Sequence, residues 1–173
     1  MEKHIQFLNR SIKAIESDDI NISEDNLEFH WYVPWNSILN YWFKSESMVI
    51  PQYEILYEFI DRDDKTICKS VKPDFVVTKY SYGNSTFNEH IELIVEIKRS
   101  SNDLKKKFKA VSKQLENQIS ALFSNGRYEY IHGIIAIGKH WRLYKYNSVK
   151  TNTHKKTWSN ASYNGIIENY KKI

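Results

Sequence analysis

The spacing of apolar residues along the chain changes several times, and each change predicts a new element. Within 1–16, four apolar residues recur at the spacing of one helix face. They are Ile5, Leu8, Ile12 and Ile15. After a polar break, a new helix start is expected at 23–25, because Ser23 can cap a helix and acidic residues favour its first turn. The aromatic run 27–43 should continue this helix, with Pro34 kinking it or splitting it in two.

From residue 48 onward the pattern is that of strands, rich in β-branched and aromatic residues and bounded by polar turns. The expected strands lie within 49–59, 66–80 and 91–98, separated by a turn at 61–64 and a loop at 82–89. A long helix follows at 102–123, where apolar residues keep the strongest helical period in the chain. The dipeptide Asn125-Gly126 is a typical helix stop.

The last part of the chain completes the order of elements. Two further strands are expected at 130–137 and 141–146, and a short helix at 164–172. The order is then helix, three strands, helix and two strands, which predicts a sheet with helices packed on it, an α/β fold of the α+β type. Because no repeat or linker interrupts the chain, residues 1–173 are expected to form one domain.

Composition narrows the classes of function. Of the 173 residues, 41% are hydrophobic and 27% are charged, a balance that excludes general disorder. The net charge of +4 permits a polyanionic partner such as nucleic acid. The single cysteine, Cys68, excludes an internal disulfide and a cysteine-rich zinc site.

Two features favour an intracellular protein of the cytoplasm or the nucleus. Residues 1–10 lack the apolar run of a signal peptide, and no apolar run approaches the ~18 residues of a transmembrane helix. No membrane partner is therefore expected. The sequence leaves the oligomeric state open, and a homodimer is compatible with it.

The strongest chemical pattern lies in the strand expected at 91–98. Side chains alternate along a strand, so Glu96 and Lys98 should share one face while Val95 and Ile97 form core on the other. A buried unpaired charge costs several kcal/mol, so a charged residue inside a strand needs a partner or a metal ion.

Asp74, near a neighbouring strand, can supply a second carboxylate. With Glu96 and a strand carbonyl, that of Ile97, it makes an oxygen-rich set suited to Mg²⁺, with Mn²⁺ as a substitute. Lys98 beside them can orient or deprotonate a water molecule and offset the charge of a phosphate. The competing interpretation is a cross-strand ion pair between Glu96 and Lys98 on a solvated sheet face.

Three segments carry a resemblance to known nucleases. Pro73-Asp74 followed by Glu96-x-Lys98 resembles the motif of the PD-(D/E)XK, or restriction-endonuclease-like, superfamily. Residues 23–34 resemble the start of the nuclease domain in type I restriction motor subunits and in crinkler-type effectors, and residues 133–144 resemble a hairpin of the same domains. The resemblance covers about 23–146, with an N-terminal helix before it and a C-terminal extension after it.

The resemblance implies a restriction-endonuclease-like core, in which a mixed central β-sheet is flanked by α-helices. It implies that Asp74 and Glu96 bind a metal ion and that Lys98 is the catalytic lysine. In these domains a helix-borne glutamate joins the metal site, which assigns Glu24 to that role and leaves Glu28, one turn later, as the second choice. The competing interpretation of Glu24 is an acid that stabilises the first turn of its helix.

The long helix at 102–123 carries two further groups of candidates. In the related domains a glutamine on this helix reaches the active site, which points to Gln114, although Gln118 stands where the family has a tyrosine. Four lysines on the same helix can follow a phosphate backbone. These are Lys105, Lys106, Lys109 and Lys113. Both groups are also compatible with a solvated helix face.

The favoured function is that of a Mg²⁺-dependent endonuclease, which hydrolyses phosphodiester bonds of nucleic acid, with DNA favoured over RNA. One alternative is a catalytically silent nuclease fold that binds nucleic acid or protein. Another is an RNA endonuclease like the cap-snatching domains of segmented negative-strand RNA viruses. Those domains carry an upstream histidine ligand, a role that His30 would take here.

Overall fold

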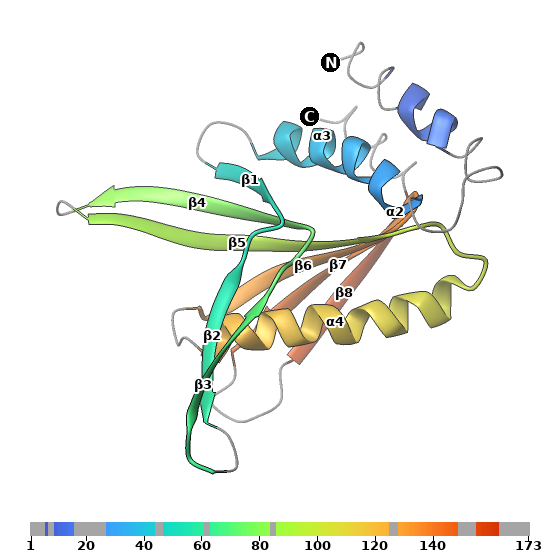
Figure 1. The fold of residues 1–173 in the computed structure, drawn as a ribbon. Helices are drawn as coiled ribbons and strands as arrows, with labels where there is room; N and C mark the ends of the chain where they lie inside the picture. Colours follow the sequence, from blue (N-terminus) through green and yellow to red (C-terminus); the bar gives the residue numbers. More distant parts are fainter. Residues whose placement is uncertain are drawn as a thin grey trace.

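A mixed β-sheet with helices on both faces forms the centre of the protein (Figure 1). The computed structural model describes Gln6 and residues 9–15, 27–43, 47–60, 63–83, 86–124, 128–148 and 155–162. Six of the described strands form the sheet, in the order β1-β4-β5-β6-β7-β8. They are β1 (Ser47–Pro51), β4 (Phe75–Gly83), β5 (Thr86–Lys98), β6 (Tyr130–Ile137), β7 (His140–Asn147) and β8 (Lys155–Ser162). Strands β5 and β6 pair in parallel and the other neighbours pair antiparallel, which confirms the expected α+β fold.

Helices α2 (Leu27–His30) and α3 (Tyr32–Trp42) lie on one face of the sheet, and α4 (Leu104–Ser124) lies on the other (Figure 1). The interruption at Trp31 agrees with the split expected from Pro34. Inside a helix, a proline ring clashes with the carbonyl four residues earlier. The new helix therefore begins at Tyr32, which places Pro34 in the first turn, where backbone N–H groups have no hydrogen-bond acceptor within the helix.

Each face of the sheet has its own hydrophobic core. Val95 and Ile97 of β5 pack beneath α3 with Trp35, as the alternation along this strand predicted. Ile94 points the other way and packs beneath α4 with Leu115. The helical residues 9–15 join the α3 side, where Ile12 and Ile15 are buried in the same core as Trp35.

The prediction of one continuous strand at 66–80 is wrong, because the structure divides this segment into two strands on either side of Pro73. Residues 66–71 form β3 (Thr66–Val71), which pairs with β2 (Ile55–Ile60) in a separate two-stranded sheet. Figure 1 shows this hairpin extending away from the central sheet. Pairing with β2 ends at Val71 and resumes in a different sheet at Phe75. Pro73 lies in the gap, where its lack of an N–H costs no ladder hydrogen bond.

The prediction of a loop at 82–89 is also wrong. Strands β4 and β5 stay paired up to Gly83 and Thr86, so both continue through most of this polar segment. The hydroxyl groups of Tyr53 and Tyr80 donate to the Glu89 carboxylate at 2.8 Å and 3.1 Å. The contact from Tyr80, which pairs with Glu89 across the two strands, and the contact from Tyr53, between β1 and β2, both stabilise a segment whose composition alone indicated a loop.

Between residues 102 and 147, the observed helix and the two strands agree closely with those expected from the sequence. Helix α4 begins after Asp103, whose carboxylate accepts a hydrogen bond of 3.0 Å from the Lys106 amide and caps the helix. Strand β8 was not predicted, because its sequence is polar and its stability depends on pairing with β7. The helix expected at 164–172 lies outside the described residues. Within the described part of the chain, no helix has the length and apolar character needed to span a bilayer.

Gly133 of β6 lies directly beneath Leu115 of α4. A Cβ atom at residue 133 would lie 2.8 Å from Leu115 Cδ2, and Leu115 is fully buried, so little space exists for it to move aside. We expect Gly133→Ala to lower the free energy of unfolding by about 1–3 kcal/mol and Leu115→Ala by about 2–5 kcal/mol. In urea unfolding the double variant should lose less stability than the sum of the two single losses. The reason is that the smaller side chain at 115 leaves room for the added Cβ at 133. Strictly additive losses would contradict the contact.

Candidate active site

Asp74, directly before β4, meets Glu96 and Lys98 at the end of β5. Phe75 pairs with Val95 in antiparallel register, which brings Asp74 beside Glu96. Lys98 lies two residues further along β5 and therefore points to the same face as Glu96. Asp74 is 6% exposed and Glu96 is 0% exposed, so both carboxyl groups are removed from solvent.

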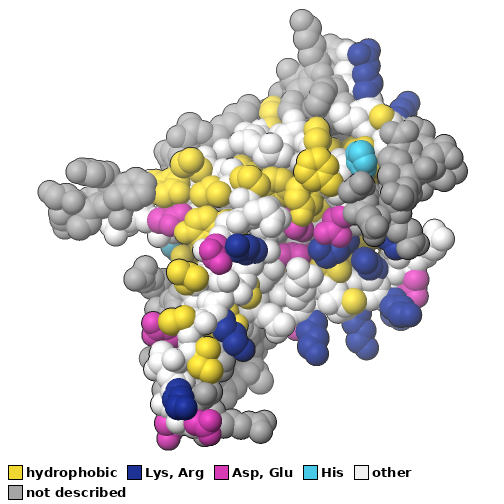
Figure 2. Space-filling view, viewed as in Figure 1, with side chains coloured by type: hydrophobic (Ala, Val, Ile, Leu, Met, Phe, Trp, Pro, Cys, Tyr) yellow, Lys and Arg dark blue, Asp and Glu magenta, His cyan; other side chains and the backbone are white. Residues whose placement is uncertain are grey.

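One ammonium group, that of Lys98, faces three carboxylates. Its Nζ atom lies 2.8 Å from Glu28 Oε1 on α2, 3.5 Å from Glu96 Oε2 and 3.8 Å from Asp74 Oδ2. The Lys98 side chain is 16% exposed, so most of it is shielded from water. Figure 2 shows acidic and basic side chains close together near the centre of the face, below a group of hydrophobic ones.

The Glu96 carboxylate receives donors from α4. Gln114 Nε2 donates to Glu96 Oε2 at 2.6 Å, and Gln118 Nε2 donates to Glu96 Oε1 at 2.5 Å. The two glutamines are four residues apart and so lie on one face of the helix. Together with Lys98 they give both oxygen atoms of this buried carboxylate a partner.

The Asp74 carboxylate is held from three directions. Its Oδ2 atom accepts a hydrogen bond of 2.6 Å from the Ile97 amide of β5. Its Oδ1 atom accepts a short hydrogen bond from the Tyr32 hydroxyl of α3 and a longer one, 3.3 Å, from Gln52 Nε2. Tyr32 is itself seated with its ring edge-on to Phe75, with centroids 5.4 Å apart. The position of Asp74 is therefore fixed by β5, α3 and the turn after β1.

Burial has a strong effect on the acidity of Glu96. Burial and the negative charge of Asp74 raise the pKa of Glu96 to about 7, against the hydrogen bond from Gln118 and the positive charge of Lys98. Near neutral pH the protonated and the charged form of this carboxyl group are therefore both populated.

The pKa values of Asp74 and Lys98 are raised for different reasons. Burial raises the pKa of Asp74, although the hydrogen bonds from Tyr32 and Ile97 favour its charged form. Burial on its own lowers the pKa of Lys98, but the surrounding carboxylates, Glu28 first among them, outweigh it and raise the pKa. The lysine is therefore positively charged at neutral pH.

The structure brings together most of the residues that the sequence singled out. Asp74, Glu96, Lys98 and Gln114 form one cluster. Glu24 lies outside the described residues. The acid that contacts Lys98 from the preceding helix is Glu28, the second choice at the sequence level, at 2.8 Å. The metal-binding role assigned to the Ile97 carbonyl stays a prediction, since the Ile97 group that contacts Asp74 is its amide.

Three residues of the cluster were not assigned to it from the sequence: Tyr32, Gln52 and Gln118. Gln118 carries a usable signal, because it lies one helical turn after Gln114 and shares its face. Tyr32 and Gln52 carry none, since they lie 42 and 22 residues before Asp74 and only the packing of α3 and β1 against β4 brings them close.

The four lysines assigned to nucleic-acid binding lie on α4, with all four exposed. Lys105, Lys106 and Lys109 line a groove of about 630 Å³ between the start of α4 and β7, and Lys113 is not among its lining residues. The groove also contains Arg142, whose guanidinium lies 4.1 Å from the centre of the Phe108 ring. Its positive lining suits an anionic partner, and binding of nucleic acid there stays a prediction.

Carboxylate oxygen atoms such as those of Asp74 and Glu96 are the kind of ligand that Mg²⁺ prefers. This ion is commonly held by one or two carboxylates and completes its coordination with water and substrate phosphate. Within the described residues, no group of three or more His, Cys, Asp or Glu side chains is arranged to hold a metal ion. The repulsion by Asp74 that helps to raise the pKa of Glu96 is what a divalent cation would relieve.

Comparisons with known protein families, with curated proteins and with solved structures find no match to this chain. The case for a function therefore rests on the residues of the cluster and on their geometry. The resemblance to PD-(D/E)XK nucleases rests on the sequence motifs described above.

Stability without a metal ion should depend on pH through Glu96. Its pKa is about 7 in the folded protein and 4.5 for an ordinary glutamate, so the stabilising contribution of the protonated form is full below 4.5 and is lost as pH rises through about 7. Urea unfolding in EDTA should show a loss on the order of 2–3 kcal/mol between about pH 5 and pH 8. Glu96→Gln should remove most of this slope, and the exposed Glu129→Gln should leave it unchanged. An equal slope in all three proteins would exclude Glu96 as its cause.

Proposed function

We propose that the protein is a Mg²⁺-dependent endonuclease that hydrolyses phosphodiester bonds of nucleic acid, with DNA as the favoured substrate. The observation that supports it is the pair of buried carboxylates, Asp74 and Glu96, that share the ammonium group of Lys98. The competing interpretation, an ion pair on a solvated sheet face, does not account for a Glu96 that is 0% exposed. Burying charged groups in this way is unfavourable for stability, and such groups are typical of functional sites.

In this proposal Asp74 and Glu96 hold the metal ion. When bound, the ion supplies positive charge that polarises the phosphate and stabilises the transition state. Gln114 and Gln118 fix the orientation of the Glu96 carboxylate, while Tyr32 does the same for Asp74. Ligands held by partners from other elements keep their geometry when charge develops.

Lys98 acts on the attacking water in this proposal. The water oxygen forms a bond to phosphorus and gives up a proton to solvent, the bond from phosphorus to the leaving sugar oxygen breaks, and the leaving oxygen takes up a proton from solvent. The Lys98 ammonium orients the water and offsets the negative charge that develops on the phosphate. Its raised pKa supports the second role, because it keeps the group charged at neutral pH.

Two observations support nucleic acid as the substrate class. The chain carries a net charge of +4, and the lysine-lined groove beside α4 provides local positive charge. The favoured order of DNA before RNA rests on the likeness of residues 133–144 to the hairpin of restriction-type nucleases. The test is a cleavage assay in which plasmid DNA and single-stranded RNA are each incubated with Mg²⁺, Mn²⁺ or EDTA. Metal-dependent cleavage of one or the other identifies the substrate, and cleavage of neither would indicate a silent binding fold.

A divalent ion should raise the melting temperature, because it binds the folded site and not the unfolded chain. At a Mg²⁺ concentration about 100 times the dissociation constant, the gain in stability is about 2.7 kcal/mol. Asp74→Ala should abolish the gain in a thermal melt, with Asp63→Ala, an exposed aspartate before β3, as the matched control. If Asp74→Ala responds to Mg²⁺ as the unchanged protein does, the ion binds elsewhere.

Lys98→Ala should lower the cleavage rate by roughly 10²–10³, the effect of removing one group that stabilises a transition state. The fold should survive, because the residues by which this strand packs into the two cores, among them Ile94, Val95 and Ile97, are unchanged. A cleavage time course and a circular dichroism melt, both with Mg²⁺, measure the two effects on the same preparation.

Lys72→Ala is the matched control for this variant, since Lys72 forms an exposed ion pair with Glu54 at 3.5 Å and lies two residues before Asp74. It should cleave at the unchanged rate. Loss of cleavage together with loss of the fold in Lys98→Ala would mean that the lysine has a structural role, as the partner of Glu96. Full activity with an unchanged melt would exclude it from the reaction.

A further inference from the structure

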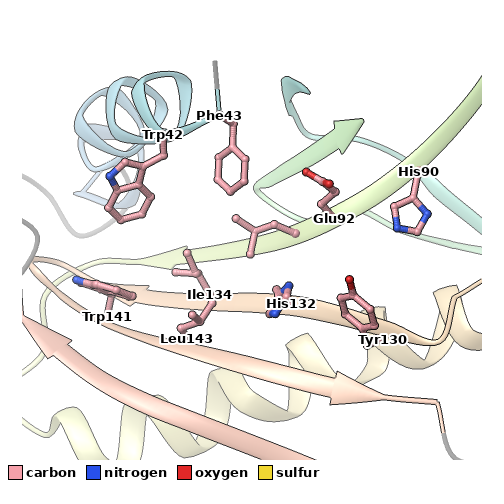
Figure 3. A pocket seen from close by; sticks show the side chains of 10 residues that line it. Trp42, Phe43, His90, Glu92, Tyr130, His132, Ile134, Trp141 and Leu143 are labelled. Carbon is pink, nitrogen blue, oxygen red and sulfur yellow. The ribbon is translucent and has the colours of Figure 1, made fainter. Parts of the chain in front are cut away.

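A second pocket lies on the other face of the central sheet, at the end of α3 (Figure 3). Its volume is about 370 Å³, within the usual range for sites that bind small molecules. Strands β5, β6 and β7 form its floor, and Trp42 and Phe43 close it from the side of α3. The pocket shares no lining residue with the cluster around Glu96, which faces α4.

A β-bulge turns Glu92 toward this pocket. Val77 of β4 pairs with Leu93 and the next residue, Thr78, pairs with Ile91, so Glu92 is an extra residue in β5. Ile91 and Ile94 both pack beneath α4, and two residues instead of one therefore lie between them. A bulge of this kind changes the direction of a side chain, and bulges are common next to functional sites.

The pocket has a hydrophobic end and a polar end. Trp42, Trp141 and Leu143 lie at one end, and Glu92 with His90 and His132 lies at the other (Figure 3). The rings of Trp42 and Trp141 have centroids 6.1 Å apart and meet at 59°, so they form a corner and not a parallel slot for a flat ring. Such a corner suits a compact apolar group.

The charges around the pocket favour a positively charged ligand. Glu92 supplies a carboxylate, and none of the described residues that line the pocket is Lys or Arg, so no ammonium or guanidinium group among them would offset the charge of a bound phosphate or carboxylate. Burial, and then the charge of Lys145, lower the pKa of His132, which is therefore neutral at pH 7. Lys145 lies outside the lining, with Nζ 4.4 Å from the centre of the Tyr130 ring. Aromatic faces beside one carboxylate are a typical environment for organic ammonium groups.

We propose that this pocket binds a small organic cation with an apolar body. The cationic group lies against the Glu92 carboxylate, and the apolar body lies in the corner of Trp42 and Trp141. The site is separate from the proposed nuclease centre and does not depend on it, since the two use opposite faces of β5.

Calorimetric titration of the full chain with benzyltrimethylammonium tests this site, with benzyl alcohol and phenylacetate as the neutral and anionic compounds of the same ring. The cation should bind, and phenylacetate should not. Glu92→Gln should weaken binding of the cation about tenfold or more, because it removes the carboxylate that the described lining residues place at the polar end. Glu96→Gln makes the same chemical change on the opposite face of the same strand and should leave the affinity unchanged.

Trp42→Leu removes one wall of the hydrophobic end and should also weaken binding, which keeps the test valid if Glu92→Gln does not fold. The proposal fails if benzyltrimethylammonium does not bind, or if phenylacetate binds as tightly. It fails equally if the folded variants at Glu92 and Trp42 keep the original affinity. Cleavage of nucleic acid by Glu92→Gln at an unchanged rate would support the independence of the two sites, and a parallel loss would overturn it.

Discussion

Glu96 holds a carboxyl group at 0% exposure inside the central sheet, and the surrounding elements compensate for its removal from water. Two of its partners, Gln114 and Gln118, come from α4. That helix is the connection between β5 and β6, which run in parallel and therefore need a crossover that returns over one face of the sheet. Gly133, with no side chain, lets α4 lie close to β6. The sheet topology and the polar partners of Glu96 thus depend on each other.

The sequence predicted those parts of the site that follow from local periodicity. Alternation along β5 placed Val95 and Ile97 in the core, and the structure confirms this. The same alternation set Glu96 and Lys98 on the other face. The helical period of α4 and the limits of β6 also agree with the structure, because both elements are buried along one continuous apolar pattern.

Other parts depend on contacts between distant segments, and no local pattern carries them. Tyr32 reaches Asp74 only because α3 packs over the start of β4. The division of 66–80 falls between Val71 and Phe75, around Pro73, which cannot donate to a strand ladder, and apolar periodicity does not register such a break. Strand β8 and the far half of the β4–β5 hairpin are polar, and they form strands because a neighbouring strand accepts and donates their hydrogen bonds.

Two of the three ion pairs of Lys98, those with Glu28 and Glu96, differ in how much water surrounds them. The Glu28 side chain is 40% exposed, whereas that of Glu96 is 0% exposed. Dissolved ions weaken ion pairs at the protein surface, and they screen buried pairs much less. Increasing ionic strength therefore weakens the link between α2 and the lysine before it affects the attraction between the lysine and β5.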